Sequence, residues 1–228
     1  MNIVDASAVT FEGLAVGLCT YKRLPSLKRL LEHIALAAKP LARPPQVIVV
    51  DNDGNDPAVG EAVIEFGQRT GLVVHHLVER RPGISAARNL VFDTADWLKV
   101  RFVAMIDDDE WPSEAWLSAL LSEQESTGAT VVGGPVAPVF PEGADHLQRH
   151  ARYWSVQQQT LDGRPFVFCT CNFLIDMAAI ASSPRRGRGT SGDRPRSRDR
   201  GCCRGTGRSR RPPCAGASRA RGPRARSG

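Results

Sequence analysis

Short apolar segments alternate with helical segments along residues 14–132, and this alternation constrains the fold more than any other feature of the sequence. Residues 14–19, 47–50, 72–78, 102–106 and 130–132 have the length and composition of buried strands. Between them, apolar side chains recur every three or four positions, as on one face of a helix. Repeated strand–helix order is typical of a mainly parallel sheet with helices on both faces. We therefore expect a Rossmann-like α/β fold.

The helices between these strands have recognisable starts. Pro25 suits a first helical turn, where the missing backbone N–H is not needed. Asp56 followed by Pro57 predicts the N-cap and first position of the next helix. The pattern weakens after Pro138. The remaining expected elements are helices over residues 85–92, 116–121 and 146–156 and a strand over residues 166–171.

Polar side chains follow three of the predicted strands, at the point where each strand ends. They are Thr20 and Tyr21 after the first strand, Asp51 and Asp53 after the second, and the acids 107–110 after the fourth. Ligands of open α/β sheets bind outside the carboxyl ends of the strands, so we expect one crevice. Capping of the following helix is the alternative for any single cluster.

The acidic cluster after the fourth strand consists of Asp107, Asp108, Asp109 and Glu110. Such charges repel one another unless a cation or donor offsets them. Alternate residues of an extended segment point the same way, so Asp107 and Asp109 can converge on one hard cation. Mg²⁺ and Mn²⁺ take oxygen ligands and are often shared between carboxylates and substrate phosphates. A solvated acidic turn is the alternative.

Two further segments carry candidate binding groups. Asp51 is placed to accept a hydrogen bond from a ribose hydroxyl or a base N–H, and Gly54 permits the tight turn that follows. A loop of turn-forming residues is the alternative. Within residues 79–89, small residues allow close backbone approach, and Arg88 can reach a phosphate or a base edge. Pairing of Arg88 with a nearby acid is the alternative.

Taken in order, these motifs resemble those of family 2 glycosyltransferases, which have a GT-A fold. The resemblance covers residues 14–180 and is carried by residues 17–23, 49–53, 83–89, 106–110, 132–136 and 170–172. The Cys-Thr-Tyr, Asp-Asn-Asp, Asp-Asp-Asp-Glu and Thr-Cys-Asn forms are most similar to the succinoglycan-biosynthesis glucosyltransferase branch. The resemblance implies inverting transfer from a nucleotide sugar, foremost a UDP-sugar, to a glycan or lipid-linked oligosaccharide in polysaccharide biosynthesis.

The same resemblance implies roles for the residues that contact the nucleoside. Thr20 and Tyr21 would line the nucleoside pocket. Asp51 would hold the uracil or the ribose, with Asp53 as a second candidate. Arg88 would lie near the nucleotide.

The resemblance also implies a metal site of the D-x-D type. Asp107 would lie near the ribose or diphosphate, and Asp109, with Asp107 as a further ligand, would bind Mg²⁺ or Mn²⁺. The metal would neutralise the departing nucleoside diphosphate while an acceptor hydroxyl attacks the anomeric carbon from the opposite face.

A general base is the one implied group that the sequence lacks. The resemblance implies an acid in a Gly-Gly-Glu-Asp-like segment beyond Asn172, to take the acceptor proton. The only acids after Asp176 are Asp193 and Asp199, and neither has that motif around it. We therefore expect this chain to be impaired in transfer. A non-catalytic nucleotide-binding remnant is the alternative.

The charge of the chain changes sign near residue 182. Residues 1–182 carry 15 Lys and Arg against 22 Asp and Glu, a formal charge of −7, whereas residues 183–228 carry 15 Arg and two Asp, a charge of +13. The second range has no Leu, Ile, Val, Met, Phe, Tyr or Trp to bury. We expect an incomplete nucleotide-sugar-binding domain over residues 1–182 and a disordered Arg/Gly-rich tail over residues 183–228. This distribution argues against a compact basic DNA-binding domain.

The composition of the tail suggests an out-of-frame translation of a GC-rich gene. Arg, Gly, Pro and Ala have GC-rich codons, and residues 183–228 lack Lys, Ile, Phe and Asn. The alternative is a genuine disordered tail that binds RNA or anionic lipid. Because it has no aromatic side chains to stack on bases, such binding would be non-specific and salt-sensitive. We expect no specific nucleic-acid partner.

The sequence also bears on location. It has no apolar run of about 18 residues or more, so no transmembrane helix is expected, and its first residues lack the features of a secretory signal. Cys19, Cys169 and Cys171 have neither disulfide-framework nor zinc spacing. We expect a cytoplasmic protein, and a lipid-linked acceptor would add peripheral association with the inner face of the cell membrane.

Overall fold

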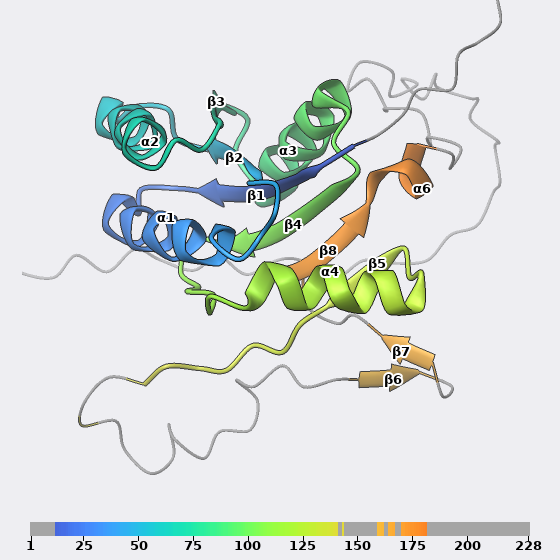
Figure 1. Ribbon diagram of the computed structural model, residues 1–228. Coiled ribbons are helices and arrows are strands. Elements are labelled where there is room, and N and C mark those ends of the chain that lie inside the picture. Colours follow the sequence, from blue (N-terminus) through green and yellow to red (C-terminus); the bar gives the residue numbers. More distant parts are fainter. Residues whose placement is uncertain (1–11, 141–142, 144–158, 162–163, 167–169, 182–228) are drawn as a thin grey trace, which may run out of the picture. The chain divides into compact units, whose positions relative to one another are not determined.

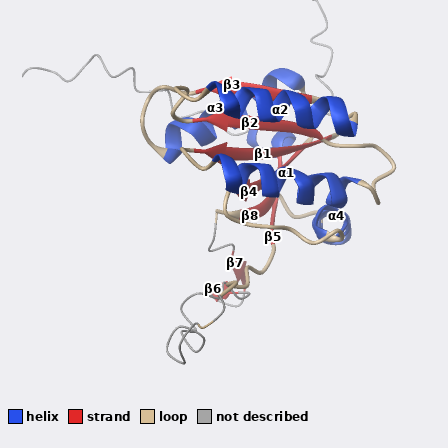
Figure 2. Cartoon of the chain, turned by 90° about the vertical axis from the view of Figure 1, so that its left-hand side faces the viewer, coloured by secondary structure: helices blue, strands red, loops and turns tan. Residues whose placement is uncertain are grey.

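The computed structural model describes residues 12–140, 143, 159–161, 164–166 and 170–181 (Figure 1). Its centre is a six-stranded sheet in the order β3-β2-β1-β4-β8-β5, which Figure 2 shows from the side. The strands are β1 (Leu14–Thr20), β2 (Gln46–Asp51), β3 (Val74–Val78), β4 (Phe102–Asp107), β5 (Val131–Gly133) and β8 (Asn172–Asp176). β1 pairs in parallel with β2 and β4, whereas β8 is antiparallel to β4 and β5. The expectation of a mainly parallel sheet is confirmed.

Helices cover both faces of this sheet. They are α1 (Leu24–Ala38), α2 (Pro57–Thr70), α3 (Ile84–Leu98), α4 (Trp116–Thr127) and the short α6 (Met177–Ala181). Apolar side chains of α1, α2 and α4 pack with Val16, Leu18 and Ile106 on one face. Those of α3 pack with Ala15, Ile48 and Met105 on the other. Because side chains alternate along each strand, they pack into two separate cores, one on each face of the sheet.

Gly17 on β1 sets how closely α3 approaches the sheet. A Cβ atom there would lie 2.4 Å from Cγ1 of Val91 on α3 and 2.8 Å from Sδ of Met105. Such distances are far inside van der Waals contact, so a side chain at this position would push α3 away. The close packing matters for the site, because α3 carries Arg88.

The expected helix starts are present. Pro25 lies in the first turn of α1. The side chain of Asp56 accepts a hydrogen bond of 3.0 Å from the backbone N–H of Ala58, which caps α2 as predicted. α2 ends at Gly71, which is in the left-handed region with a φ of 75°.

Three expectations on elements differ from the structure or lie outside it. The helix expected over residues 85–92 extends over Ile84–Leu98, because Ala95 and Leu98 continue the buried stripe beyond the polar Asp93 and Thr94. Of the strand expected over residues 166–171, residues 167–169 lie outside the described residues, and residues 170 and 171 are not in a strand. A strand pairs with β4 only from Asn172 onward, and β7 (Arg164–Phe166) pairs with β6 (Gln159–Leu161) in an antiparallel hairpin. The expected helix over residues 146–156 and the expected tail over residues 183–228 lie outside the described residues.

None of the helices in the described part of the chain is long and apolar enough to cross a membrane.

Candidate functional site

The carboxyl ends of β1, β2 and β4 lie side by side. In the parallel pairing, Thr20 is the partner of Asp51, and Cys19 is the partner of Asp107. The polar residues that follow the three strands therefore meet at one edge of the sheet, as their positions in the sequence predict.

A cavity of about 300 Å³ lies beside the end of β2. It is lined by Lys22, Leu24, Pro25, Asp51, Asp53, Asp56 and Val59. Asp51 is only 2% exposed, and its Oδ1 accepts a hydrogen bond of 2.9 Å from the backbone N–H of Asp53. Lys22 Nζ lies 3.7 Å from Oδ1 of Asp53. Because three acids and one lysine line this cavity, it suits a ligand rich in hydrogen-bond donors, such as a ribose or a base.

Thr20 and Tyr21 lie at the end of β1 but do not line this cavity. Thr20 is buried, and its hydroxyl donates a hydrogen bond of 2.8 Å to Oδ2 of Asp108. Tyr21 is 54% exposed, and the Lys22 ammonium lies 5.0 Å from the centre of its ring. Lys22 has a φ of 56°, a left-handed conformation that is uncommon for a lysine. The strand end thus presents an exposed ring and a lysine, with the Thr20 hydroxyl turned inward.

The acids after β4 separate into buried and exposed carboxylates. The Asp108 side chain is 8% exposed and accepts hydrogen bonds from Thr20 and from Nη1 of Arg23, the latter at 3.1 Å. The side chains of Asp107 and Asp109 are 36% and 58% exposed. The expected alternation of an extended segment does not produce this pattern, because β4 ends at Asp107 and the two following residues lie in a turn, closed by a hydrogen bond of 3.1 Å from the N–H of Glu110 to the carbonyl of Asp107. Asp107 and Asp109 are therefore the two aspartates of the cluster that remain accessible to a ligand.

Burial shapes the protonation of the other two acids. It raises the pKa of Asp108, an effect that the Thr20 hydroxyl and the Arg23 guanidinium oppose. Burial also raises the pKa of Glu110, opposed by a hydrogen bond with Cys171 and by the backbone N–H of Asp107 at 3.4 Å. These two acids are therefore held by protein donors.

Arg88 connects α3 to the acidic cluster. Its Nη2 donates a hydrogen bond of 2.7 Å to Oδ1 of Asp107, and its Nη1 donates one of 2.6 Å to the hydroxyl of Thr170. Its Nε atom is buried and has no hydrogen-bond partner among the described residues. Arg88 thus pairs with a nearby acid, which is one of the two alternatives left open by the sequence. It also lies at the strand ends, where the other alternative, contact with a phosphate or a base edge, requires it to be.

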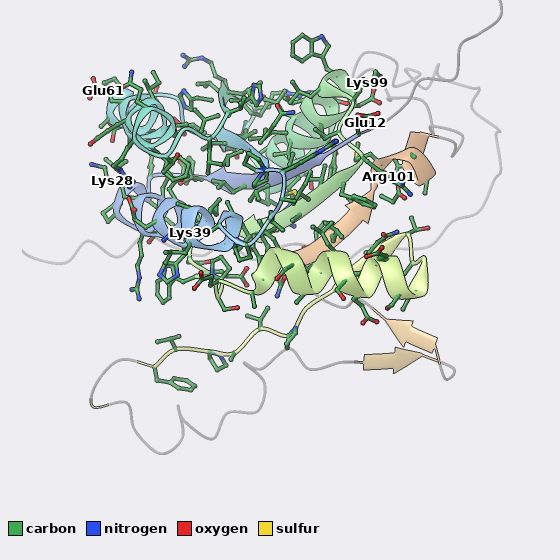
Figure 3. The ribbon with its side chains drawn as sticks, viewed as in Figure 1. Glu12, Lys28, Lys39, Glu61, Lys99 and Arg101 are labelled. Atoms are coloured by element: carbon green, nitrogen blue, oxygen red, sulfur yellow. The ribbon has the colours of Figure 1, made fainter. Side chains whose placement is uncertain are left out.

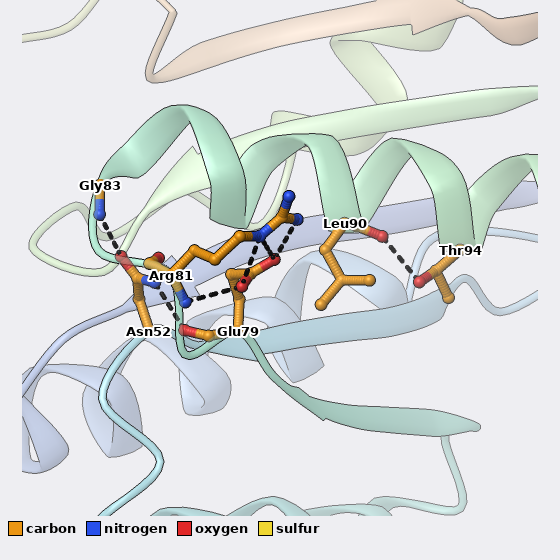
Figure 4. A network of polar contacts seen from close by, with 6 residues as sticks. All are labelled: Asn52, Glu79, Arg81, Gly83, Leu90 and Thr94. Carbon is orange, nitrogen blue, oxygen red and sulfur yellow. Dashed lines mark hydrogen bonds and ion pairs between the residues drawn. The ribbon is translucent and has the colours of Figure 1, made fainter. Parts of the chain in front are cut away.

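The loop between β3 and α3 is held by Asn52, whose role the sequence analysis missed. Its Nδ2 donates to the carbonyls of Glu79 and Arg81 at 2.7 and 2.8 Å, and its Oδ1 accepts from the N–H of Gly83 at 3.2 Å (Figure 4). Hydrogen bonds from the side chain and backbone of Arg81 lower the pKa of Glu79 to about 2. Since Gly83 precedes α3, this network sets the start of the helix that carries Arg88.

Asn172 is a second residue whose role the sequence analysis missed, although it belongs to the Thr-Cys-Asn motif. Its Oδ1 accepts a hydrogen bond of 2.8 Å from Nε1 of Trp116, and its Nδ2 donates one of 3.1 Å to the carbonyl of Pro135. A Cβ atom at Gly134 would lie 2.6 Å from that Nδ2 atom. Asn172 therefore joins α4 to the segment after β5, and the lack of a side chain at Gly134 lets that segment lie close to Asn172.

The donor set at the end of β4 fits a cation that arrives with phosphates. No group of three or more His, Cys, Asp or Glu side chains able to hold a metal occurs among the described residues. Asp107 and Asp109 offer two accessible carboxylates, each with one oxygen bonded to an arginine. Mg²⁺ and Mn²⁺ are commonly held by one or two carboxylates together with substrate phosphates.

Comparison with known proteins decides the family. The model of glycosyl transferase family 2 matches residues 15–182. The chain belongs to this family. The family 2 match ends at the residue where the charge of the sequence changes sign. Among curated proteins, the chain is 34% identical to the succinoglycan biosynthesis protein ExoM of Rhizobium meliloti over 175 residues, 75% of this chain and 54% of ExoM.

A second relative and a solved structure extend the comparison. The chain is 32% identical to the glucosyl-dolichyl phosphate glucuronosyltransferase of Haloferax volcanii over 149 residues, 63% of this chain and 44% of that protein. The chain thus spans about half the length of the curated relatives it matches. S. aureus TarS 1–349, solved in complex with UDP, has the same fold, with a TM-score of 0.55, 16% identity, and coverage of 74% of this chain and 48% of that 1–349 chain. The expected GT-A-like fold is confirmed.

Proposed function

We propose that this chain binds a nucleotide sugar, foremost a UDP-sugar, for glycosyl transfer in polysaccharide biosynthesis. The observation that carries the proposal is the position of Asp51 at a cavity of about 300 Å³, with only β1 between its strand and the strand that ends in Asp107. The Asp51 carboxylate suits a donor-rich nucleoside, and the Arg88 guanidinium beside Asp107 suits an anionic diphosphate. The UDP found in TarS and the biosynthetic names of the relatives support it.

The nucleoside end of the ligand contacts the loop after β2 in this proposal. The Asp51 carboxylate accepts hydrogen bonds from the uracil or the ribose, and Asp53 is the second acceptor. Tyr21, half exposed at the end of β1, borders the nucleoside. Thr20 contributes to the site indirectly, because its hydroxyl donates a hydrogen bond to the Asp108 carboxylate.

The diphosphate end contacts α3 and the end of β4. Arg88 places a guanidinium beside Asp107, where Nη1 can bond a phosphate oxygen after release of Thr170. Asp109 and Asp107 would hold Mg²⁺ or Mn²⁺, which would neutralise the departing nucleoside diphosphate.

Transfer itself requires a base that takes the acceptor proton. Residues 1–228 contain no Gly-Gly-Glu-Asp-like segment. We therefore propose that this chain binds the donor and has weak or no transferase activity. The acceptor in the complete reaction is a glycan or a lipid-linked oligosaccharide, reached with inversion at the anomeric carbon. A lipid-linked acceptor would bring the protein to the cytoplasmic face of the membrane.

Calorimetry with UDP, GDP and ADP in the presence of Mn²⁺ tests the donor assignment. We expect UDP to bind most tightly, and Asp51→Asn to weaken UDP about tenfold, because a charged acceptor is lost. Glu61→Gln is the control, since Glu61 is exposed on α2 (Figure 3), and should leave affinity unchanged. Tighter binding of GDP or ADP, or no effect of Asp51→Asn, would refute the assignment. Robust sugar transfer by the 228-residue chain would refute the proposed loss of turnover.

A further inference from the structure

Arg23 contacts two of the acids that follow β4, although 85 and 86 residues separate it from them in the sequence. Its Nη1 atom donates hydrogen bonds of 3.1 Å to Oδ1 of Asp108 and of 2.8 Å to Oδ2 of Asp109. These carboxylates also raise the pKa of the guanidinium, which stays charged. A permanent positive charge thus lies against Asp109, one of the two carboxylates that are proposed to bind a divalent cation.

We propose that Arg23 is a built-in counter-ion that pairs with Asp109 in the metal-free site and is displaced from it by the divalent cation. The inference rests on the proposed function, because it takes Asp109 as a metal ligand. Without such a partner, neighbouring carboxylates at the strand end would repel one another. A divalent cation at Asp109 and a guanidinium at the same carboxylate repel each other in turn.

The surroundings of Arg23 and Arg88 indicate which arginine gives way. The Arg23 side chain is 52% exposed and reaches both acids through a single nitrogen atom. The Arg88 side chain is 19% exposed and is held at two nitrogens by Asp107 and Thr170. Arg23 can therefore swing into solvent at low cost, whereas Arg88 cannot. Arg23 keeps its bond to Asp108 or exchanges it for water.

This pairing makes metal binding depend on the nucleotide. The guanidinium opposes a cation that arrives alone, whereas the negative charge of a diphosphate offsets this opposition. Arg23 is thus a positioning residue for Asp109 and a determinant of metal affinity. It does not contact the reacting atoms in this account.

Calorimetric titration of Mn²⁺ into the chain saturated with UDP tests the inference. We expect Arg23→Gln to bind Mn²⁺ about threefold to fivefold more tightly, the range for a partly exposed charge pair. Arg23→Lys, which keeps the charge, should remain near the native affinity. Arg69→Gln is the control, because Arg69 on α2 pairs with the exposed Glu32 and with none of the acids at the end of β4 among the described residues. Arg23→Gln should also melt at a lower temperature, since Asp108 would keep only Thr20 as a donor.

A measurement on the native chain covers the case in which Arg23→Gln does not fold. Saturation with Mg²⁺ and UDP should speed the hydrogen exchange of the Arg23 guanidinium protons in NMR spectra, because the pair with Asp109 breaks. Unchanged exchange, or Mn²⁺ affinity that is unchanged or weaker in Arg23→Gln, would overturn the inference alone. No Mn²⁺ binding to the native chain with UDP would overturn both the inference and the proposed metal site.

Discussion

The Arg88 guanidinium and the Asp107 carboxylate, 19 residues apart in the sequence, are joined by a hydrogen bond of 2.7 Å that links α3 to the end of β4. The same guanidinium reaches Thr170, just before β8. Three segments that are separate in the sequence thus meet at one arginine. The network of Asn52 and Glu79 fixes the start of the helix that carries it. Arg88 is therefore the residue through which loop geometry and site geometry are coupled.

Arg88→Lys should weaken UDP binding about tenfold, because a lysine cannot hold Thr170, Asp107 and a phosphate oxygen with one ammonium. The measurement is calorimetry with UDP and Mn²⁺. Arg101→Lys is a matched control, since Arg101 pairs with Asp176 beside the opposite end of β4 (Figure 3). Equal UDP affinity in Arg88→Lys and Arg101→Lys would show that Arg88 serves only the fold.

Gly134→Ala should destabilise the chain by about 1–3 kcal/mol, because the new methyl group would lie 2.6 Å from Nδ2 of Asn172. Asn172→Ala alone should cost about 1–3 kcal/mol, since Nε1 of Trp116 loses its acceptor. The double variant should lose less unfolding free energy than the two single variants lose together, because the clash between the new methyl group at position 134 and the residue 172 side chain is gone. Urea unfolding of the four proteins measures this coupling. Strict additivity would contradict the close contact.

Acid should destabilise the chain partly through Glu79. Its pKa is lowered from 4.5 to about 2 in the folded chain by the hydrogen bonds from Arg81. A lowered pKa contributes stability above pH 4.5, and this contribution is lost as the pH falls toward 2. Glu79→Gln should therefore show a shallower fall in melting temperature between pH 4.5 and 2. Parallel melting profiles for Glu79→Gln and the native chain would refute this.

The sequence predicted the strand ends well, for a physical reason. Buried parallel strands are continuous apolar runs, so the first acid after each run marks where the strand leaves the core. Asp51 and Asp107 lie at the predicted ends of β2 and β4. The sequence analysis placed Asp107 and Asp109 on one side of an extended segment, but the separation of the buried Asp108 from these two exposed acids arises in a turn, closed by the N–H of Glu110 on the carbonyl of Asp107.

The contacts between distant segments were not predictable in the same way. Arg23 bonds Asp109 across 86 residues, and Asn172 bonds Trp116 across 56, so no local spacing reveals either pair. The strand β8 was not predicted, because residues 166–171 and Asn172–Asp176 are both apolar-rich and periodicity cannot choose between them. Pairing with β4 decides the matter.

The origin of residues 183–228 is open to a direct test on the gene. We propose that the reading frame changes near codon 182, where the family 2 match ends and the Arg-rich composition begins. Translation of the other two frames downstream, with resequencing of the region, should reveal a Gly-Gly-Glu-Asp-like segment. If neither frame encodes one, the frame-change proposal is wrong, and a genuine basic tail remains.

The most direct test of the nucleotide-sugar site is calorimetry of UDP binding with and without Mn²⁺, in the native chain and in Asp109→Ala. We expect UDP to bind more tightly with Mn²⁺ in the native chain, and Asp109→Ala to lose that metal dependence. Glu61→Gln should behave as the native chain. UDP affinity that is the same with and without Mn²⁺ in the native chain, or that still depends on Mn²⁺ in Asp109→Ala, would contradict the assignment of the site.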